Sequence, residues 1–180
     1  MKDIIQLYKE TNNFEKAVKE SGLPAFIGFL KLARAGLVSL EDKIKYGTPA
    51  QKLGGLAEQE FQKIIPEAIN YNFLKVNNEF FDFKYNDVTI DVKFSSLHQR
   101  GKYEYWYFRA NSTADLFVAF LEKEKGAKLQ DYHILVLPQS FVENGYVNIK
   151  KGSYLFEGFN IERNKLKQFL DQYQETKDFL

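Results

Sequence analysis

Apolar residues recur at helical spacing through the first part of the chain. Three segments, residues 3–11, 14–22 and 23–36, each carry such a pattern, and the last two end at glycine, so they predict three short helices. The Gly-Leu-Pro corner between the last two predicts a helix-turn-helix-like region over residues 1–46. The third helix is mostly apolar apart from Lys31 and Arg34, which favours packing or dimerisation. DNA contact through these two basic residues is the alternative.

The pattern changes from helices to strands within residues 47–180. KIKYGTP reads as a connection, and an amphipathic helix is predicted over residues 50–65. EFFDFKY and VTIDVKF then flank Asn86-Asp87, ADLFVAFL and YHILVLP resemble buried strands, and residues 161–173 form a closing amphipathic helix. This order predicts an α/β domain with a central mixed β-sheet flanked by helices.

Composition narrows the possible chemistry. The 180 residues are 44% hydrophobic, which is enough for a packed core. The absence of cysteine excludes disulfides, zinc clusters and thiol catalysis, and the sequence has no apolar run of membrane-spanning length. We therefore expect a soluble, cytoplasmic protein. The net charge of +1 neither supports nor excludes nucleic-acid binding.

The predicted hairpin brings acidic residues together. With Asn86 and Asp87 as the turn, the cross-strand pairs are Tyr85–Val88, Phe83–Ile90 and Asp82–Asp91. Two apposed carboxylates repel by up to about 1 kcal/mol when exposed, and a divalent cation such as Mg²⁺ would offset this repulsion. Lys93 projects from the same face and can reach a phosphate or a water. The alternative is a solvated face on which Lys84 and Lys93 pair with the aspartates.

The stretch from Gly54 to about Leu121 resembles the PD-(D/E)XK nuclease superfamily, which has the restriction-endonuclease-like fold. FFDF supplies Asp82, IDVKFSS supplies Asp91 and Lys93, and GGLAEQEF supplies Glu58. Two departures are Phe81 in place of the usual proline and Asp rather than Glu before x-Lys. The resemblance implies that Asp82, Asp91, Lys93 and Glu58 are catalytic, and that the three acids bind Mg²⁺, for which Mn²⁺ is expected to substitute.

A helical wheel leaves the choice of glutamate open. Glu60 falls among the apolar residues of the predicted helix, whereas Glu58 lies at the edge of that face. The family pattern favours Glu58, because a ligand must reach from the rim of the packed face to the sheet edge. Glu60 is the alternative metal ligand.

The resemblance implies a metal-dependent endonuclease that hydrolyses DNA phosphodiester bonds, of restriction, phage or recombination type. A homodimer is expected if both strands of a symmetric site are cut. One alternative is a structure-specific junction resolvase, and another is a regulator that binds DNA through the N-terminal helices without cutting it. Apposed carboxylates disfavour the regulator, because a pure binder gains nothing from them.

The segment after the motif, SSLHQRGKYEYWYFRANS, mixes polar, basic and aromatic residues. Its candidate DNA contacts are Ser95, Ser96, His98, Gln99, Arg100, Lys102 and Arg109. The interleaved aromatic residues could stack on bases, and the alternative is that they pack in the core beside a solvated loop.

Overall fold

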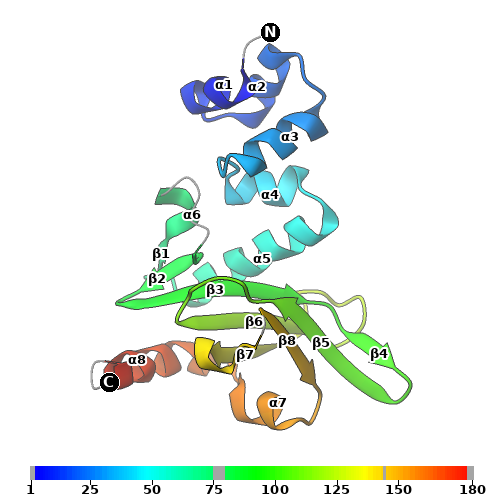
Figure 1. The fold of residues 1–180 in the computed structure, drawn as a ribbon, viewed down its shortest axis with the longest axis vertical. Coiled ribbons are helices and arrows are strands. Elements are labelled where there is room, and N and C mark those ends of the chain that lie inside the picture. Colours follow the sequence, from blue (N-terminus) through cyan, green and yellow to red (C-terminus); the bar gives the residue numbers. More distant parts are fainter. Residues whose placement is uncertain (1–2, 75–79, 144, 178–180) are drawn as a thin grey trace.

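Four short helices form the N-terminal end of the molecule (Figure 1). The computed structural model describes residues 3–74, 80–143 and 145–177. Helices α1 (Ile4–Thr11), α2 (Phe14–Ser21) and α3 (Ala25–Arg34) confirm the three predicted helices, and α4 (Leu40–Tyr46) follows them. These helices enclose a small core of their own, whose largest fully buried side chains are Ile4, Phe29 and Leu32.

Helix α4 lies where the sequence predicted only a connection. The Ser39 side chain caps its N-terminus by accepting a hydrogen bond from the Asp42 amide, and acidic residues occupy the first turn and lysines the last. Helix α5 (Pro49–Ile64) begins directly afterwards with a capping box between Thr48 and Gln51. Helix α5 then runs from the N-terminal helices down to the sheet (Figure 1).

A mixed sheet forms the centre of the fold, as predicted, and it contains six strands. Its spatial order is β1-β2-β3-β6-β7-β9, in which β3 and β6 are parallel and all other neighbours are antiparallel. The strands are β1 (Ile69–Asn70), β2 (Phe83–Tyr85), β3 (Val88–Ser95), β6 (Leu116–Glu122), β7 (Tyr132–Pro138) and β9 (Asn160–Ile161). A short helix, α6 (Tyr71–Leu74), connects β1 to the segment that precedes β2.

A second, three-stranded antiparallel sheet was not predicted. It consists of β4 (His98–Arg100), β5 (Tyr103–Arg109) and β8 (Tyr146–Lys150), with β5 in the middle. The remaining elements are η1 (Gln139–Phe141), α7 (Tyr154–Phe159), η2 (Arg163–Lys165) and the closing helix α8 (Leu166–Lys177). Within the described residues, no helix combines the length and the apolar character needed to cross a membrane.

The central sheet separates two further apolar cores. On one face, side chains of β3, β6 and β7 pack against Phe61 of α5 and Leu170 of α8. On the other face, alternate residues of β6 and β7 pack against Trp106 of β5 and Phe156 of α7. The strands β6 and β7 are buried on both faces, which explains why their sequences read as nearly continuous apolar runs.

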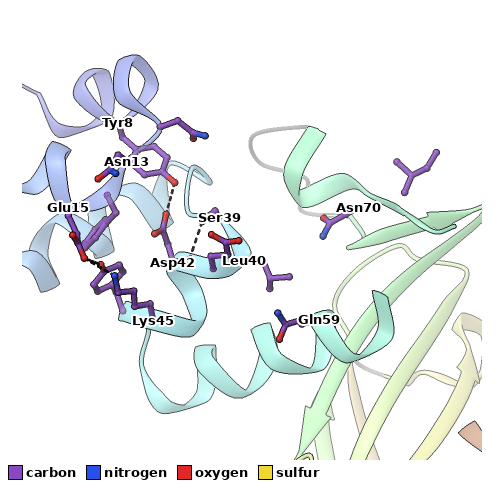
Figure 2. A pocket seen from close by; sticks show the side chains of 14 residues that line it. Tyr8, Asn13, Glu15, Ser39, Leu40, Asp42, Lys45, Gln59 and Asn70 are labelled. Carbon is purple, nitrogen blue, oxygen red and sulfur yellow. Dashed lines mark hydrogen bonds and ion pairs between the residues drawn. The ribbon is translucent and has the colours of Figure 1, made fainter. Parts of the chain in front are cut away.

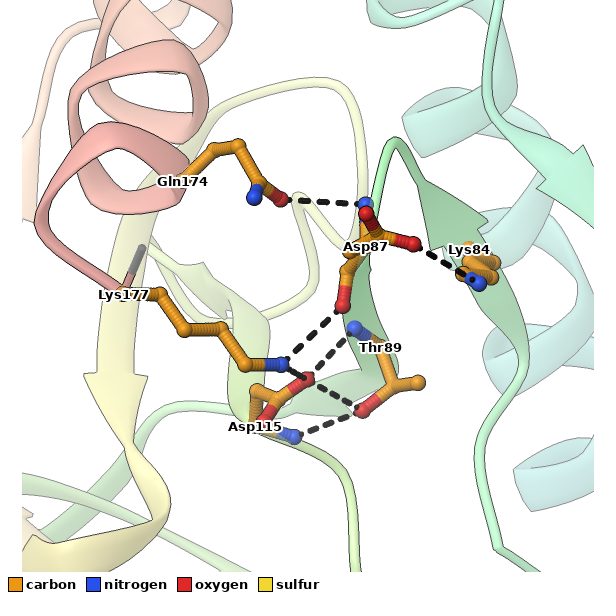
Figure 3. Close-up of polar contacts among 6 residues, drawn as sticks. All are labelled: Lys84, Asp87, Thr89, Asp115, Gln174 and Lys177. Atoms are coloured by element: carbon orange, nitrogen blue, oxygen red, sulfur yellow. Dashed lines mark hydrogen bonds and ion pairs between the residues drawn. The ribbon is translucent and has the colours of Figure 1, made fainter. Parts of the chain in front are cut away.

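Polar contacts fasten α8 to the β2–β3 turn and to the start of β6 (Figure 3). Lys177 Nζ bonds to the Asp87 carbonyl oxygen at 3.0 Å and to Asp115 Oδ2 at 2.8 Å. The same Asp115 oxygen accepts hydrogen bonds from the amide and the hydroxyl of Thr89. Although burial alone would raise the pKa of Asp115, the bonds from Lys177 and Thr89 hold it below its usual value. Asp115 is therefore a structural residue whose carboxylate accepts hydrogen bonds from Thr89 and Lys177.

Candidate active site

The β2–β3 hairpin places Asp82 at the end of its ladder. The pairs Phe83–Ile90 and Tyr85–Val88 are present as predicted. The predicted Asp82–Asp91 pair is wrong, because strand pairing stops at Phe83 and the Asp82 amide donates to the Ile90 carbonyl at 3.0 Å. Asp82 Oδ2 accepts a hydrogen bond from the Val92 amide at 2.8 Å. The side chain thus takes the place that a strand carbonyl would occupy.

Asp91 lies in the middle of β3 and is only 4% exposed. Burial raises its pKa to about 6, and the nearby charge of Asp82 acts in the same direction. Lys93 offsets part of this effect, because its Nζ lies 2.6 Å from Asp91 Oδ1. The two aspartates are therefore neighbours although they are not cross-strand partners.

Glu58 approaches Asp82 from helix α5. It is 6% exposed, and burial together with the Asp82 charge raises its pKa to about 7. Lys43 Nζ lies 3.3 Å from Glu58 Oε1. The Asn72 amide nitrogen donates to Glu58 Oε2 at 3.2 Å and to Asp82 Oδ1 at 2.8 Å, so it bridges the two carboxylates. Asp82 thus links Glu58 on one side to Asp91 on the other.

Sequence reasoning missed Lys43 and Asn72. Lys43 belongs to the segment that was interpreted as a connection but forms α4, and Asn72 lies in the short helix α6. Neither residue stands in a motif, and each reaches the site only because its helix docks beside α5 or β2. No pattern in the sequence could have identified them.

The arrangement suits a cation that needs few protein ligands. No group of three or more histidine, aspartate and glutamate side chains among the described residues is gathered closely enough to enclose a metal ion. Mg²⁺, however, is commonly held by one or two carboxylates, with water and substrate phosphate completing its coordination. The Ser112 hydroxyl lies near Asp91 and favours its charged form, which is the form that binds a cation. This hydroxyl has no hydrogen-bond partner of ordinary geometry among the described residues. The donor set of Asp82 and Asp91 therefore fits Mg²⁺.

Glu60, the alternative ligand, lies in a different environment. Its Oε1 accepts hydrogen bonds from Tyr132 Oη at 2.7 Å and from Arg163 at 3.1 Å. Burial would raise its pKa, but the bonds from Tyr132, Arg163 and Lys63 outweigh burial and lower it. The structure thus brings Glu58, not Glu60, to Asp82.

The candidate DNA contacts divide by exposure. Ser95 is buried and exchanges hydrogen bonds with the backbone of Tyr107, so it joins β3 to β5 and does not face solvent. Ser96 and His98 are half-buried. The exposed candidates are Gln99, Arg100, Lys102 and Arg109 near β4 and β5, and Lys31 and Arg34 on α3.

A cavity of about 800 Å³ lies beside the N-terminal helices (Figure 2). It is bounded by the N-terminal helices on one side and by Gln59 and Asn70 on the other. Its polar residues are engaged with one another, since Tyr8 Oη donates to Asp42 at 2.6 Å and Lys45 pairs with Glu15 at 2.7 Å. Neither Asp82 nor Asp91 lines the cavity.

Comparisons with known proteins are sparse. No family model matches the sequence, and a comparison with curated proteins gives no match. Among solved structures, the bacterial homing endonuclease I-Ssp6803I aligns with this chain at a TM-score of 0.46 and 13% sequence identity, covering 72% of this chain and 97% of that one.

Proposed function

We propose that this protein is a metal-dependent endonuclease of the PD-(D/E)XK type that hydrolyses DNA phosphodiester bonds. One observation carries the proposal. Asp91 and Glu58 are buried, and burial together with the negative charge of Asp82 raises the pKa of each. Lys93 pairs with Asp91 in the same site. Buried acids crowded in this way destabilise a protein unless a cation neutralises them, and perturbed pKa values of this kind are typical of active sites.

In this proposal Asp82 and Asp91 hold Mg²⁺, and Glu58 contributes from α5 through its proximity to Asp82. When bound, the ion would supply a nucleophile at neutral pH and would neutralise charge on the phosphate. Asp82 is oriented for this role by hydrogen bonds from Val92 and Asn72. These bonds fix its carboxylate before any ligand arrives, which lowers the cost of organising the site.

Lys93 provides the positive charge of the site. Its Nζ rests on Asp91 and its side chain is 28% exposed, so the ammonium group can turn toward a phosphate when Asp91 engages a cation. Lys43 plays a comparable part at Glu58, because it favours the ionised carboxylate that a metal requires. Lys43 and Asn72 are positioning residues, whereas Lys93 is proposed to be catalytic.

In this proposal the N-terminal helices serve dimerisation. Helix α3 exposes Phe26 and Ile27, at 57% and 40%, beside its basic residues Lys31 and Arg34. Exposed apolar side chains of this size support dimerisation over DNA contact. A homodimer would place one carboxylate site on each strand of a symmetric target.

Plasmid nicking tests the proposal. Wild-type protein with Mg²⁺ should convert supercoiled DNA to open-circular or linear forms, whereas protein without a divalent ion and the Asp91→Asn variant with Mg²⁺ should leave it intact. Asp131→Asn is a suitable control, because Asp131 is exposed and pairs only with Lys123 among the ion pairs of the described residues. Full cleavage by Asp91→Asn would refute the role given to that carboxylate.

A further inference from the structure

The β4–β5–β8 sheet has one face that packs on the core and one face that points toward solvent. Trp106 and Phe108 of β5 and Val147 and Ile149 of β8 point inward and are buried in the core beneath the sheet. The intervening residues point outward, and Tyr103, Tyr107 and Tyr146 are about half exposed, at 48%, 50% and 54%. The sheet therefore presents large, half-exposed aromatic side chains on the face that points away from the core.

This face is also positively charged. Together with the three tyrosines it carries Arg100 on β4, Arg109 on β5 and Lys150 on β8, and we call these six residues the basic face. The outward positions of the three strands, all of them described, include no aspartate or glutamate. Glu104 points to the opposite side, where it pairs with Lys151 at 2.6 Å. The basic face is thus complementary to a polyanion.

The tyrosine rings hold the cations at the surface. Lys150 Nζ lies 3.9 Å from the centre of the Tyr103 ring, and the Arg109 guanidinium lies 5.5 Å from that of Tyr146. The His98 ring packs on Tyr107 with 4.5 Å between centroids. Since neighbouring groups already cover these rings, the face favours contacts of the cations and hydroxyls with phosphates over stacking on unpaired bases.

The basic face adjoins the carboxylate site. Ser95, two residues after Lys93 on β3, is bonded to the backbone of Tyr107, so β5 runs back along β3. Ser112, three residues beyond the end of β5, lies near Asp91. A ligand on the basic face would therefore continue toward Lys93 and Asp91, and Figure 1 shows the β4–β5 hairpin extending beyond the end of β3.

We propose that the basic face docks the phosphate backbone of duplex DNA and leads it into the carboxylate site. This proposal rests on the proposed function, because it takes DNA as the substrate. It adds Lys150 and Tyr146 to the predicted contacts, and it makes the β4–β5–β8 sheet, not α3, the main docking surface.

Charge reversal on the basic face tests the proposal. The binding of a fluorescently labelled duplex would be followed by anisotropy over a range of salt concentrations in the presence of EDTA. Lys150→Glu should bind about tenfold more weakly than wild type and lower the slope of log affinity against log salt by about 1. Arg100→Glu, on the neighbouring strand, should do the same. Emission from Trp106, the single tryptophan and fully buried, would verify that each variant is folded.

Lys165→Glu is the matched control. It makes the same change in net charge at a lysine of η2 that is 62% exposed and lies outside the basic face. Its affinity and salt slope should equal those of the wild type. Equal effects of Lys150→Glu and Lys165→Glu would overturn the proposal, and so would a loss confined to single-stranded DNA while duplex binding persists.

Failure of this proposal can be distinguished from failure of the proposed function. Mg²⁺-dependent nicking that requires Asp91, combined with unchanged duplex affinity in Lys150→Glu, would overturn the docking surface alone. Loss of duplex affinity in Lys150→Glu, combined with a wild type that never nicks, would support the docking surface and refute the nuclease.

Discussion

Glu58 and Glu60 lie two residues apart on the same helix but in opposite environments. Glu60 is surrounded by donors, from Tyr132, Arg163 and Lys63, and its pKa is lowered. Glu58 is more deeply buried and faces Asp82, and its pKa is raised to about 7. A structural acid in this fold is thus fully compensated by neighbouring donors, whereas at Glu58 the donors Lys43 and Asn72 do not offset burial and the charge of Asp82.

The same contrast holds for Asp115 and Asp91 at neighbouring strands. Asp115 is held by Lys177 and Thr89 and has a lowered pKa (Figure 3). Asp91 is more buried and has a pKa of about 6 despite its ion pair with Lys93. Acidity alone therefore does not mark the site. What distinguishes it is a set of acids whose charges the protein leaves partly uncompensated.

The largest expected effect is a difference in nicking rate between variants of the two glutamates. Glu58→Gln should lower the rate of Mg²⁺-dependent plasmid nicking by about 10²-fold or more, because it removes a charge from the site. Glu60→Gln should stay within about twofold of wild type, since glutamine keeps an acceptor for Tyr132. Initial nicking rates under identical conditions measure both. Similar losses in the two variants would show that the contrast has no functional meaning.

The next effect concerns the stability provided by Asp115. Asp115→Ala should lower the free energy of unfolding by about 3 kcal/mol, because the amide and hydroxyl of Thr89 and the ammonium group of Lys177 lose a charged acceptor. Chemical denaturation measures this loss. Asp131→Ala, which removes an exposed ion pair with Lys123, should cost less than about 1 kcal/mol. A loss at Asp115 as small as that at Asp131 would contradict its structural role.

Asp91 should have the opposite effect on stability. Its pKa rises from 3.8 in the unfolded chain to about 6 in the folded protein, so the folded protein binds the proton more tightly. Its contribution to stability is therefore present below pH 3.8 and is lost as the pH rises through about 6. Asp91→Asn should consequently be more stable than wild type at pH 8, by about 3 kcal/mol.

Denaturation of wild type and Asp91→Asn at several pH values tests this expectation. The advantage of the variant should vanish at low pH, where the wild-type carboxyl is protonated as well. An Asp91→Asn variant that is less stable than wild type at pH 8 would contradict the view that this buried acid is poorly compensated.

The smallest effect concerns Lys43. Lys43→Met should raise the pKa of Glu58 further, because Lys43 is a cation that favours the charged form. The carboxyl chemical shift of Glu58, followed by NMR over a pH titration, measures the change directly. Lys45→Met, which alters an exposed pair with Glu15, serves as the control and should leave the Glu58 titration unchanged. An unaltered titration in Lys43→Met would remove Lys43 from the site.

Much of the fold could be predicted from the sequence because local signals agreed with the final packing. The Asn86-Asp87 turn and the alternation around it predicted the pairs Phe83–Ile90 and Tyr85–Val88 correctly. The position of Asp82 could not be predicted in the same way. Its carboxylate bonds to the Val92 amide, and this contact between side chain and backbone ends the ladder one residue earlier than alternation implies.

The β4–β5–β8 sheet escaped prediction for a different reason. Strand β5 reads YEYWYFR, with aromatic residues on both faces, so the usual alternation of apolar and polar positions is hidden. Only the structure separates the buried Trp106 and Phe108 from the exposed Tyr103 and Tyr107. Among the residues near the acids, those in the motif could be predicted, whereas Lys43 and Asn72 depend on tertiary contacts.

Calorimetric titration with Mg²⁺ tests the central claim most directly, namely that the acids around Asp82 are gathered to bind a divalent cation. The titration would be performed at pH 6.5 in two buffers of different ionisation enthalpy, with wild type, Asp82→Asn and Glu60→Gln. We predict that wild type and Glu60→Gln bind Mg²⁺ with release of protons, because Glu58 and Asp91 are partly protonated at this pH and must ionise. Asp82→Asn should lose this binding. Absence of binding in the wild type, or unchanged binding and proton release in Asp82→Asn, would contradict the account.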